Sequence, residues 1–297
     1  MVWLLFALAS NVLYSVVSIL DQLLRKRHVK HDSSLTVIWL AFFFLIWLAV
    51  IPFIHISVPE FPKLAAALIA GFIVVIASLP YFYALSVEEA SKVMPIWQFS
   101  SIFVLVFSAI FLGEKLASRH YYGFALMFLG GLLLSVSKAV RGFEINKTLL
   151  LILATSAVSS VYLVLVKFFY ATESFWNGFF WLSLGNFVGA VFLLVLPKNF
   201  KYVKRQLAAL TKGAVLLLVA TTLMTFLADI SLLFAVKAGP VSLVSVIGVT
   251  QIMFLFLMTV FLSKYFPKIL KERIDRKALL TKLAAIALMI AGLYLVR

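Results

Sequence analysis

Cysteine is absent from the 297-residue sequence, and histidine occurs only four times. The lack of cysteine excludes disulfide bonds, thiolate metal sites and cysteine nucleophiles. The histidines lie in expected loops or at segment ends, and no two share a span at the spacing of metal ligands; they are His28, His31, His55 and His120. The sequence therefore gives no reason to expect a metal ion, and nothing in it indicates another cofactor.

Charged residues are also scarce, at 12% of the chain, whereas 64% of the residues are hydrophobic. A soluble domain carries about a quarter charged residues. The apolar residues form runs of about 20, the length at which a helix crosses about 30 Å of hydrocarbon. Lipid admits only helices and closed barrels, and these runs are too uniformly apolar for barrel strands. The predicted fold class is therefore an all-α integral membrane protein.

Ten apolar runs, separated by charged or proline-marked breaks, are expected to be membrane-spanning helices. They are Val2–Leu24, Leu35–Ile56, Leu64–Leu85, Val93–Leu112, Tyr121–Ser137, Leu149–Val166, Phe175–Leu196, Ala214–Val236, Val241–Leu262 and Ala278–Val296. No positively charged segment precedes the first run, so we interpret it as a retained span and not as a signal peptide.

The order of elements in the first half of the chain returns in the second. Tyr83-Ala84-Leu85 precedes an apolar span that ends at Leu112, and Phe234-Ala235-Val236 precedes one that ends at Leu262. We therefore predict two repeats of five helices each, one over residues 1–142 and one over residues 143–297. Because five is odd, the second repeat would be inverted relative to the first, as in many secondary transporters, which bind substrate between the repeats near the midplane.

Basic residues outnumber acidic ones by 26 to 11, for a net charge of +15. Most lie in odd-numbered loops, in clusters at Arg25–Lys30, Lys198–Lys212 and Lys264–Lys282. Because positive residues stay preferentially on the cytoplasmic side, these loops are expected in the cytoplasm and both termini outside. Anionic lipid headgroups of a plasma or inner membrane are the expected partner of this charge, and nucleic acid is not.

Part of the sequence resembles a known family. The residues concerned are Tyr83-Ala84-Leu85, Ala90, Phe111-Leu112-Gly113-Glu114-Lys115-Leu116, Gly123 and Gly130-Gly131. In this order they resemble the EamA-type transporters of the drug/metabolite transporter superfamily. The resemblance implies ten helices in two inverted repeats around a central cavity, and export or exchange of small metabolites such as amino acids. Similar proteins also carry nucleotide sugars, sugar phosphates or lipid-linked sugars.

The sequence departs from the family pattern in two places. The first span has Ala9-Ser10-Asn11 where a Trp-Gly pair is common, and Lys264-Tyr265 follows the ninth span where a second Gly-Glu motif would stand. Many relatives also keep their termini in the cytoplasm, whereas the charge distribution of this chain places them outside. These departures bear on orientation more than on fold.

Asp229 is the leading candidate for a functional charge, because it lies near the middle of the eighth expected span after Thr221, Thr222 and Thr225. An acid at this depth is costly unless it faces a cavity or finds a partner. It could take up and release a proton, or pair with a substrate amine. Alternatively, it is a structural group that is hydrogen-bonded within the bundle or paired with Lys167.

Further polar and aromatic residues lie at similar depths and form a candidate substrate site. They are Asn11, Tyr14, Tyr83, Trp97, Gln98, Ser159, Tyr162 and Gln251. Asn11 and Tyr14 of the first span correspond to Ser159 and Tyr162 of the sixth, its repeat counterpart. The rings of Tyr83, Trp97 and also Tyr81 could stack on an organic solute. Each polar residue has a packing interpretation as well, because small polar groups often join helices.

No catalytic motif accompanies these residues: the sequence has no HExxH, no aspartate pair suited to intramembrane proteolysis and no phosphate-binding P-loop. We therefore predict a secondary active transporter, exporter or exchanger, and not an enzyme. A lipid-linked sugar flippase and a non-transporting assembly protein of the same fold remain alternatives. Gly185 and Gly189 form a GxxxG pattern, which marks a close helix contact within one chain or between two copies of a homodimer.

Overall fold

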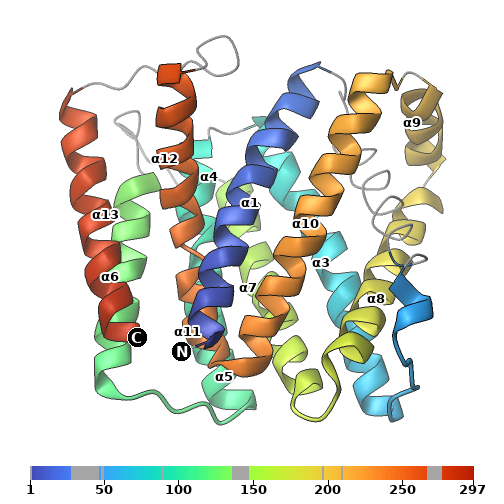
Figure 1. The fold of residues 1–297 in the computed structure, drawn as a ribbon, viewed down its shortest axis with the longest axis horizontal. Coiled ribbons are helices and arrows are strands. Elements are labelled where there is room, and N and C mark those ends of the chain that lie inside the picture. The colour runs from blue at the N-terminus through green and yellow to red at the C-terminus, as the bar shows by residue number, and fades with distance from the viewer. Residues whose placement is uncertain are drawn as a thin grey trace.

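A computed structural model describes residues 2–27, 47, 50–87, 90–135, 147–195, 197–208, 210–265 and 276–297. Within these residues the chain forms helices, turns and loops and no strand. Most of the helices run side by side, up and down the bundle, and both termini lie at the same end (Figure 1).

The helices are named in chain order. The long ones are α1 Val2–Arg27, α3 Phe61–Val87, α6 Ser118–Ser135, α7 Lys147–Tyr170, α8 Phe175–Val195, α10 Lys212–Ala238 and α13 Arg276–Val296. The short ones are the 3-10 turn η1 Ile51–Phe53 and the helices α4 Ala90–Trp97, α5 Phe99–Phe111, α9 Pro197–Ala208, α11 Val241–Ile247 and α12 Thr250–Tyr265.

Seven segments of the described residues are long and apolar enough to cross a membrane, namely Val2–Asp21, Phe61–Tyr81, Val93–Phe111, Lys147–Tyr170, Phe175–Val195, Lys212–Ala238 and Val241–Tyr265. These helices make the chain a multi-pass membrane protein. The fifth and tenth predicted spans correspond to α6 and α13, which pack along each other. The second, Leu35–Ile56, lies largely outside the described residues.

The fourth and ninth predicted spans are each interrupted in mid-bundle, whereas the sequence left open only a helix break at Pro80 and Pro95. The fourth consists of α4 and α5 with a break at Gln98, and the ninth of α11 and α12 with a break at Gly248 and Val249. Pro95, three residues before the first break, has no N–H to give to a helix. At the second, the Val249 N–H bonds to the carbonyl of Val246, three residues back, so the turn is tighter than α-helical.

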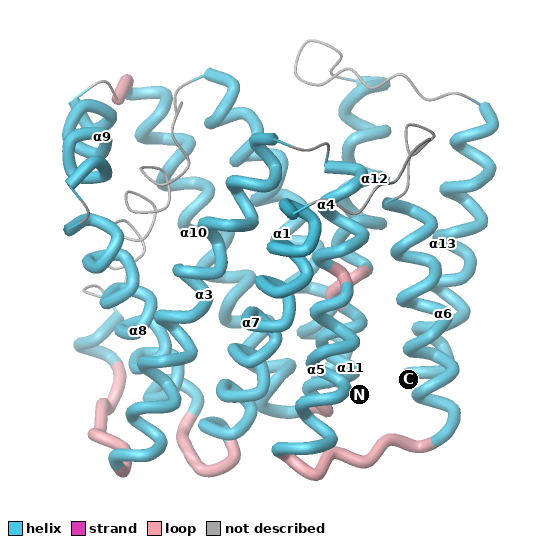
Figure 2. Tube along the Cα trace, turned by 180° about the vertical axis from the view of Figure 1, so that it is seen from behind, coloured by secondary structure: helices cyan, strands magenta, loops and turns pink. Residues whose placement is uncertain are grey.

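The basic stretch 198–212, predicted as a loop, contains the short helix α9, which lies at the edge of the bundle (Figure 2). Val203 of α9 is buried, whereas Phe200 and Leu207 expose about half of their surface. Lys204 and Arg205 are also exposed. The sequence signal of this helix was masked by its charge, because charged clusters between apolar spans are usually loops. About half of each of the other two basic clusters lies outside the described residues.

The helices pair in a reciprocal way. α1 packs along α10, and α7 packs along α3. In the predicted scheme of two five-helix repeats, both contacts are of one kind, because the first span of each repeat packs on the third span of the other repeat. Two inverted repeats would produce such an exchange, and the division of the chain at residue 142 stays a prediction.

Glycines let α3 and α8 approach closely. A Cβ atom added to Gly185 would lie 2.5 Å from the carbonyl oxygen of Leu68, and one added to Gly71 would lie 2.3 Å from that of Leu182. Gly189 faces Val75 in the same way. The predicted GxxxG contact is thus confirmed, and it lies within one chain.

Replacing Gly185 with alanine is expected to destabilise the protein by about 1–3 kcal/mol, because the new methyl group would collide with the backbone of α3. Gly213 is a matched control, since a Cβ atom there would meet no heavy atom within 4 Å. The measurement is the temperature at which each detergent-solubilised variant loses its monodisperse elution peak. Equal loss temperatures for the two alanine variants would mean that this helix contact is not tight.

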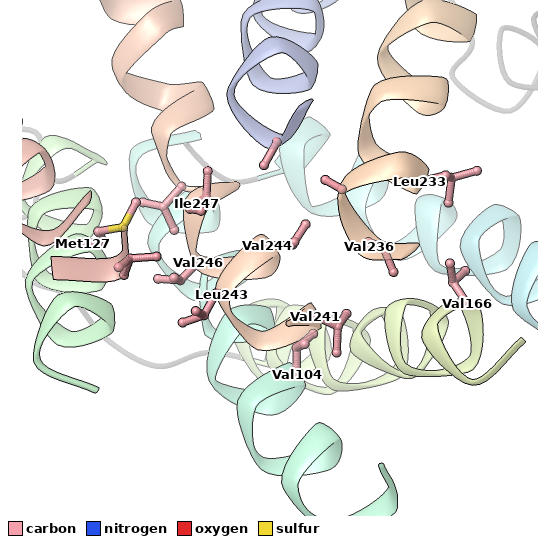
Figure 3. Packing of buried hydrophobic residues seen from close by; sticks show 14 of the residues in the cluster. Val104, Met127, Val166, Leu233, Val236, Val241, Leu243, Val244, Val246 and Ile247 are labelled. Carbon is pink, nitrogen blue, oxygen red and sulfur yellow. The ribbon is translucent and has the colours of Figure 1, made fainter. Parts of the chain in front are cut away.

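A dense apolar cluster fills the end of the bundle that carries the termini. Val236, Val241 and Leu243 expose at most 1% of their surface, and their side chains gather where α5, α10 and α11 meet (Figure 3). Val104 and Val244 belong to the same cluster. They also line the cavity described below, so the cluster forms part of the cavity wall.

Candidate functional site

A cavity of about 480 Å³ lies where the two broken helices meet in the bundle. Its walls come from α1, α3, α7, α10 and both broken helices. This volume is in the range of sites that bind small organic ligands, about 300–1,000 Å³. The polar and aromatic wall residues are Asn11, Tyr14, Ser18, Ser78, Tyr81, Trp97, Gln98, Ser100, Ser101, Ser159, Ser160, Tyr162, Ser245 and Gln251.

No Asp, Glu, Lys, Arg or His is among the described residues that line the cavity. The wall is therefore polar through hydroxyl and carboxamide groups and apolar through residues such as Val74, Met94 and Leu163. No group of three or more His, Asp or Glu that could hold a metal ion occurs in the part of the chain that the structure describes.

Asn11 secures the break between α11 and α12. Its Nδ2 donates to the carbonyl oxygen of Ile247 at 2.9 Å and to Oγ1 of Thr250 at 3.1 Å. Ser101 Oγ donates to the carbonyl oxygen of Ser245 at 3.1 Å. These bonds satisfy carbonyl groups at and near the interruption, which lipid could not do. The packing interpretation thus holds for the Asn11 amide nitrogen, although the residue also lines the cavity.

Gln98 and Gln251 likewise bond across helices from the cavity wall. Gln98 Nε2 donates to Ser135 Oγ at 2.7 Å and to the carbonyl oxygen of Gly131 at 3.3 Å, which ties the first break to α6. Gln251 Nε2 donates to Ser18 Oγ of α1 at 3.3 Å. The sequence left open whether these residues line a pathway or join helices, and their positions combine both.

Asp229 meets the cavity through Tyr14. The Tyr14 hydroxyl donates a hydrogen bond to Oδ1 of Asp229, joining α1 to α10. Tyr14 and Tyr162 line the cavity, whereas Asp229 lies behind them. The sequence left open an ion pair between Asp229 and Lys167, but these two side chains are not paired in the structure. Lys167 Nζ instead donates to the carbonyl oxygens of Val236, Lys237 and Gly239 at the end of α10.

Of the three aromatic candidates, two line the cavity and one does not. Tyr81 and Trp97 both line the cavity, with ring centroids 4.6 Å apart and planes inclined by 49°. Tyr83 exposes 56% of its surface and is not part of the wall. The difference follows from helical spacing, since residues two apart point to different sides of a helix. Ser159 also lines the wall, and its Oγ is buried without a hydrogen-bond partner.

Glu114, noted in the sequence only within the family-like stretch, fixes the start of α11. Its Oε1 accepts from the N–H of Val241 at 2.8 Å, and its Oε2 accepts from the N–H and hydroxyl of Ser242 at 3.1 and 2.5 Å. Gly113 precedes it with a φ of 65°, which glycine adopts without strain. The Gly-Glu pair of the first half thus holds the broken helix of the second.

Sequence reasoning missed most of the serines in the wall, because single serines in apolar spans carry no motif. Their helical register could have indicated them: Ser78 lies one turn before Tyr81, and Ser100 and Ser101 lie three residues after Trp97 and Gln98 respectively. Only their position beside the break makes them part of one site.

The chain is similar to known proteins in sequence and in fold. Residues 1–136 match the EamA-like transporter family. A stretch of 58 residues, 20% of this chain, is 41% identical to a Sinorhizobium sp protein called "Uncharacterized transporter in cobO 3'region", and it spans 41% of that relative's length. A solved crystal structure matches 99% of this chain and 97% of its own at a TM-score of 0.71 with 18% sequence identity, a likeness of fold.

Proposed function

We propose that this protein, whose residues 1–136 belong to the EamA-like transporter family, is a non-enzymatic, secondary active transporter of a small organic solute. The observation that carries this proposal is the cavity of about 480 Å³ at the meeting point of two interrupted helices. In transporters built on inverted repeats, discontinuous helices mark the binding site near the membrane midplane.

The proposed architecture has ten helices in two inverted repeats, residues 1–142 and 143–297. The reciprocal packing of α1 on α10 and of α7 on α3 supports it, as does the interruption of both the fourth and the ninth span. The mechanism is alternating access, in which the two halves rock around the cavity and expose it to one side at a time. Export or exchange is the proposed direction.

Asp229 is the proposed proton-coupling group, and Tyr14 connects it to the solute. The hydrogen bond from the Tyr14 hydroxyl to Asp229 supports this assignment. Because Tyr14 lines the cavity, this bond couples the protonation of the Asp229 carboxyl group to the cavity wall. The proposed substrate site comprises the remaining candidates that line the cavity, namely Asn11, Trp97, Gln98, Ser159, Tyr162 and Gln251.

The two alternative functions fit the cavity less well. A lipid-linked sugar carries phosphate, and burying phosphate without a cation is costly, yet the described wall residues include no basic side chain. A non-transporting assembly protein would have little use for a polar cavity of this size. Transport of a soluble solute is therefore favoured over both.

Solute flux in proteoliposomes tests the proposal, with labelled amino acids and other metabolites as the panel. Ser100→Trp should reduce flux at least about tenfold, because the indole would fill the cavity that binds the solute. Ile110→Trp is the matched control on the same helix, since Ile110 is 67% exposed and faces away from the cavity. Equal flux in both variants, or no flux of any solute in the wild type, would overturn the transport function.

We further propose a plasma or inner membrane location, with the odd-numbered loops and α9 in the cytoplasm against anionic lipid, and both termini outside. The exposed side chains of Lys201, Lys204 and Arg205 support this orientation, because lysine and arginine favour the cytoplasmic side. In this cysteine-free chain, Val2→Cys should react with an impermeant thiol reagent added to intact cells. Reaction only after lysis would reverse the orientation.

A further inference from the structure

Five of the seven serines of the cavity wall donate their hydroxyl protons to carbonyl groups of the protein. Ser78 Oγ donates to the carbonyl oxygen of Val75 at 2.6 Å, Ser160 Oγ to that of Ala157 at 2.6 Å, and Ser245 Oγ to that of Ser242 at 2.7 Å. A hydroxyl has one donor and two acceptor lone pairs. A serine whose proton is bound to its own helix therefore offers lone pairs to whatever fills the cavity.

Other polar groups of the cavity wall also donate their hydrogen bonds within the protein. Ser18 Oγ donates to the carbonyl oxygen of Tyr14 at 2.8 Å, and the Tyr14 hydroxyl donates to Asp229. The amide nitrogens of Asn11 and Gln98 each make two hydrogen bonds to the protein. The wall is consequently rich in acceptors, and its complement is a solute rich in hydroxyl or N–H donors.

Charge and shape narrow the solute further. A carboxylate or phosphate would enter a cavity whose described wall has no cation, and an unpaired buried anion is strongly disfavoured. The rings of Tyr81 and Trp97 form an aromatic part of the wall, which favours a planar ring in the solute. Ser159, with its buried and unpartnered Oγ, adds a group that a bound solute would satisfy.

We infer that the cavity selects hydroxyl-rich solutes that carry no anionic group and bear one planar ring, the chemistry of nucleosides and aryl glycosides. This inference rests on the proposed transport function for its biological meaning. It narrows that function, because amino acids, sugar phosphates and nucleotide sugars all carry an anionic group. About 480 Å³ is ample for a nucleoside.

Binding to the purified full-length protein tests this selection, with adenosine and phenyl β-glucoside as neutral probes. AMP and phenyl β-glucoside 6-phosphate are their charged, anionic counterparts, to be compared by isothermal titration calorimetry. Each charged probe should bind at least about tenfold more weakly than its neutral parent. 2′-O-Methyladenosine keeps the oxygen and loses the donor, so it should also bind more weakly than adenosine.

Protein variants separate the cavity from non-specific binding. Trp97→Leu should weaken adenosine binding several-fold, whereas Trp176→Leu on α8, which is not part of the cavity wall, should not change it. Equal or tighter binding of a charged probe, or no binding of either neutral probe at about 10 mM, would overturn the inference. Flux of an anionic metabolite would support the transport proposal and contradict this inference. Adenosine binding without flux of any solute would support this inference and contradict the transport proposal.

Discussion

Asp229→Asn is expected to abolish solute flux driven by a pH gradient and to leave the fold intact. Asparagine has the size of aspartate, and its Oδ1 can still accept the hydrogen bond that the Tyr14 hydroxyl donates in the wild type. What it lacks is the ability to bind and release a proton. A gradient imposed across proteoliposomes should therefore drive flux in the wild type, and the variant should give only the rate of empty vesicles.

Glu60→Gln is the matched control, because it makes the same chemical change in a carboxylate whose side chain is 79% exposed and ion-paired with Lys63. Its gradient-driven flux should equal that of the wild type. If Asp229→Asn also transports like the wild type, Asp229 has a structural role. The protein would then be a facilitator or an exchanger without proton coupling.

Glu114→Ala is expected to cost about 2–4 kcal/mol of stability, the second large effect. Hydrogen bonds to a charged group contribute about 1.5–3 kcal/mol each, and an unmade bond leaves its partner unsatisfied. Here one carboxylate accepts three, from the two backbone N–H groups and the hydroxyl at the start of α11. Since Val244 and Ser245 of the same short helix line the cavity, the variant should also weaken solute binding.

Two neighbouring substitutions isolate this effect. Lys115→Ala removes an exposed side chain of the same loop and should be neutral. Glu114→Gln keeps an oxygen acceptor but loses the charge, so its melting temperature should lie between those of the wild type and Glu114→Ala. Identical melting of Glu114→Ala and Lys115→Ala would show that the carboxylate does not hold α11.

The sequence predicted the helical membrane class and most spans, because hydropathy records the solvent that a helix faces. It left open a helix break at Pro95, three residues before the one at Gln98, and it did not predict the break at Gly248. A broken helix keeps the composition of a whole one, and the groups that stabilise the break, such as Asn11, come from distant segments. For the same reason α9 was missed, since its helix is amphipathic and charged, not apolar.

The candidate site was predictable in part. Depth within a span identified Tyr14, Asp229 and the cavity-lining carboxamides, because polar groups in lipid are rare and costly. Sequence could not tell that Asp229 is bonded to Tyr14 and not paired with Lys167, since three-dimensional neighbours are set by packing. Nor could it separate Tyr81 from Tyr83, which differ in direction and not in depth.

Reactivity of Ser100→Cys from each side of sealed vesicles tests alternating access most directly. The natural chain has no cysteine, so an impermeant methanethiosulfonate reports this position alone, and it reacts only with a thiol that water reaches. Ile110→Cys, which would lie on the exposed apolar face of the same helix, is the unreactive control. The account predicts labelling of Ser100→Cys from the outside and, in separate samples, from the inside. Labelling from one side only under every condition, or from neither, would contradict it.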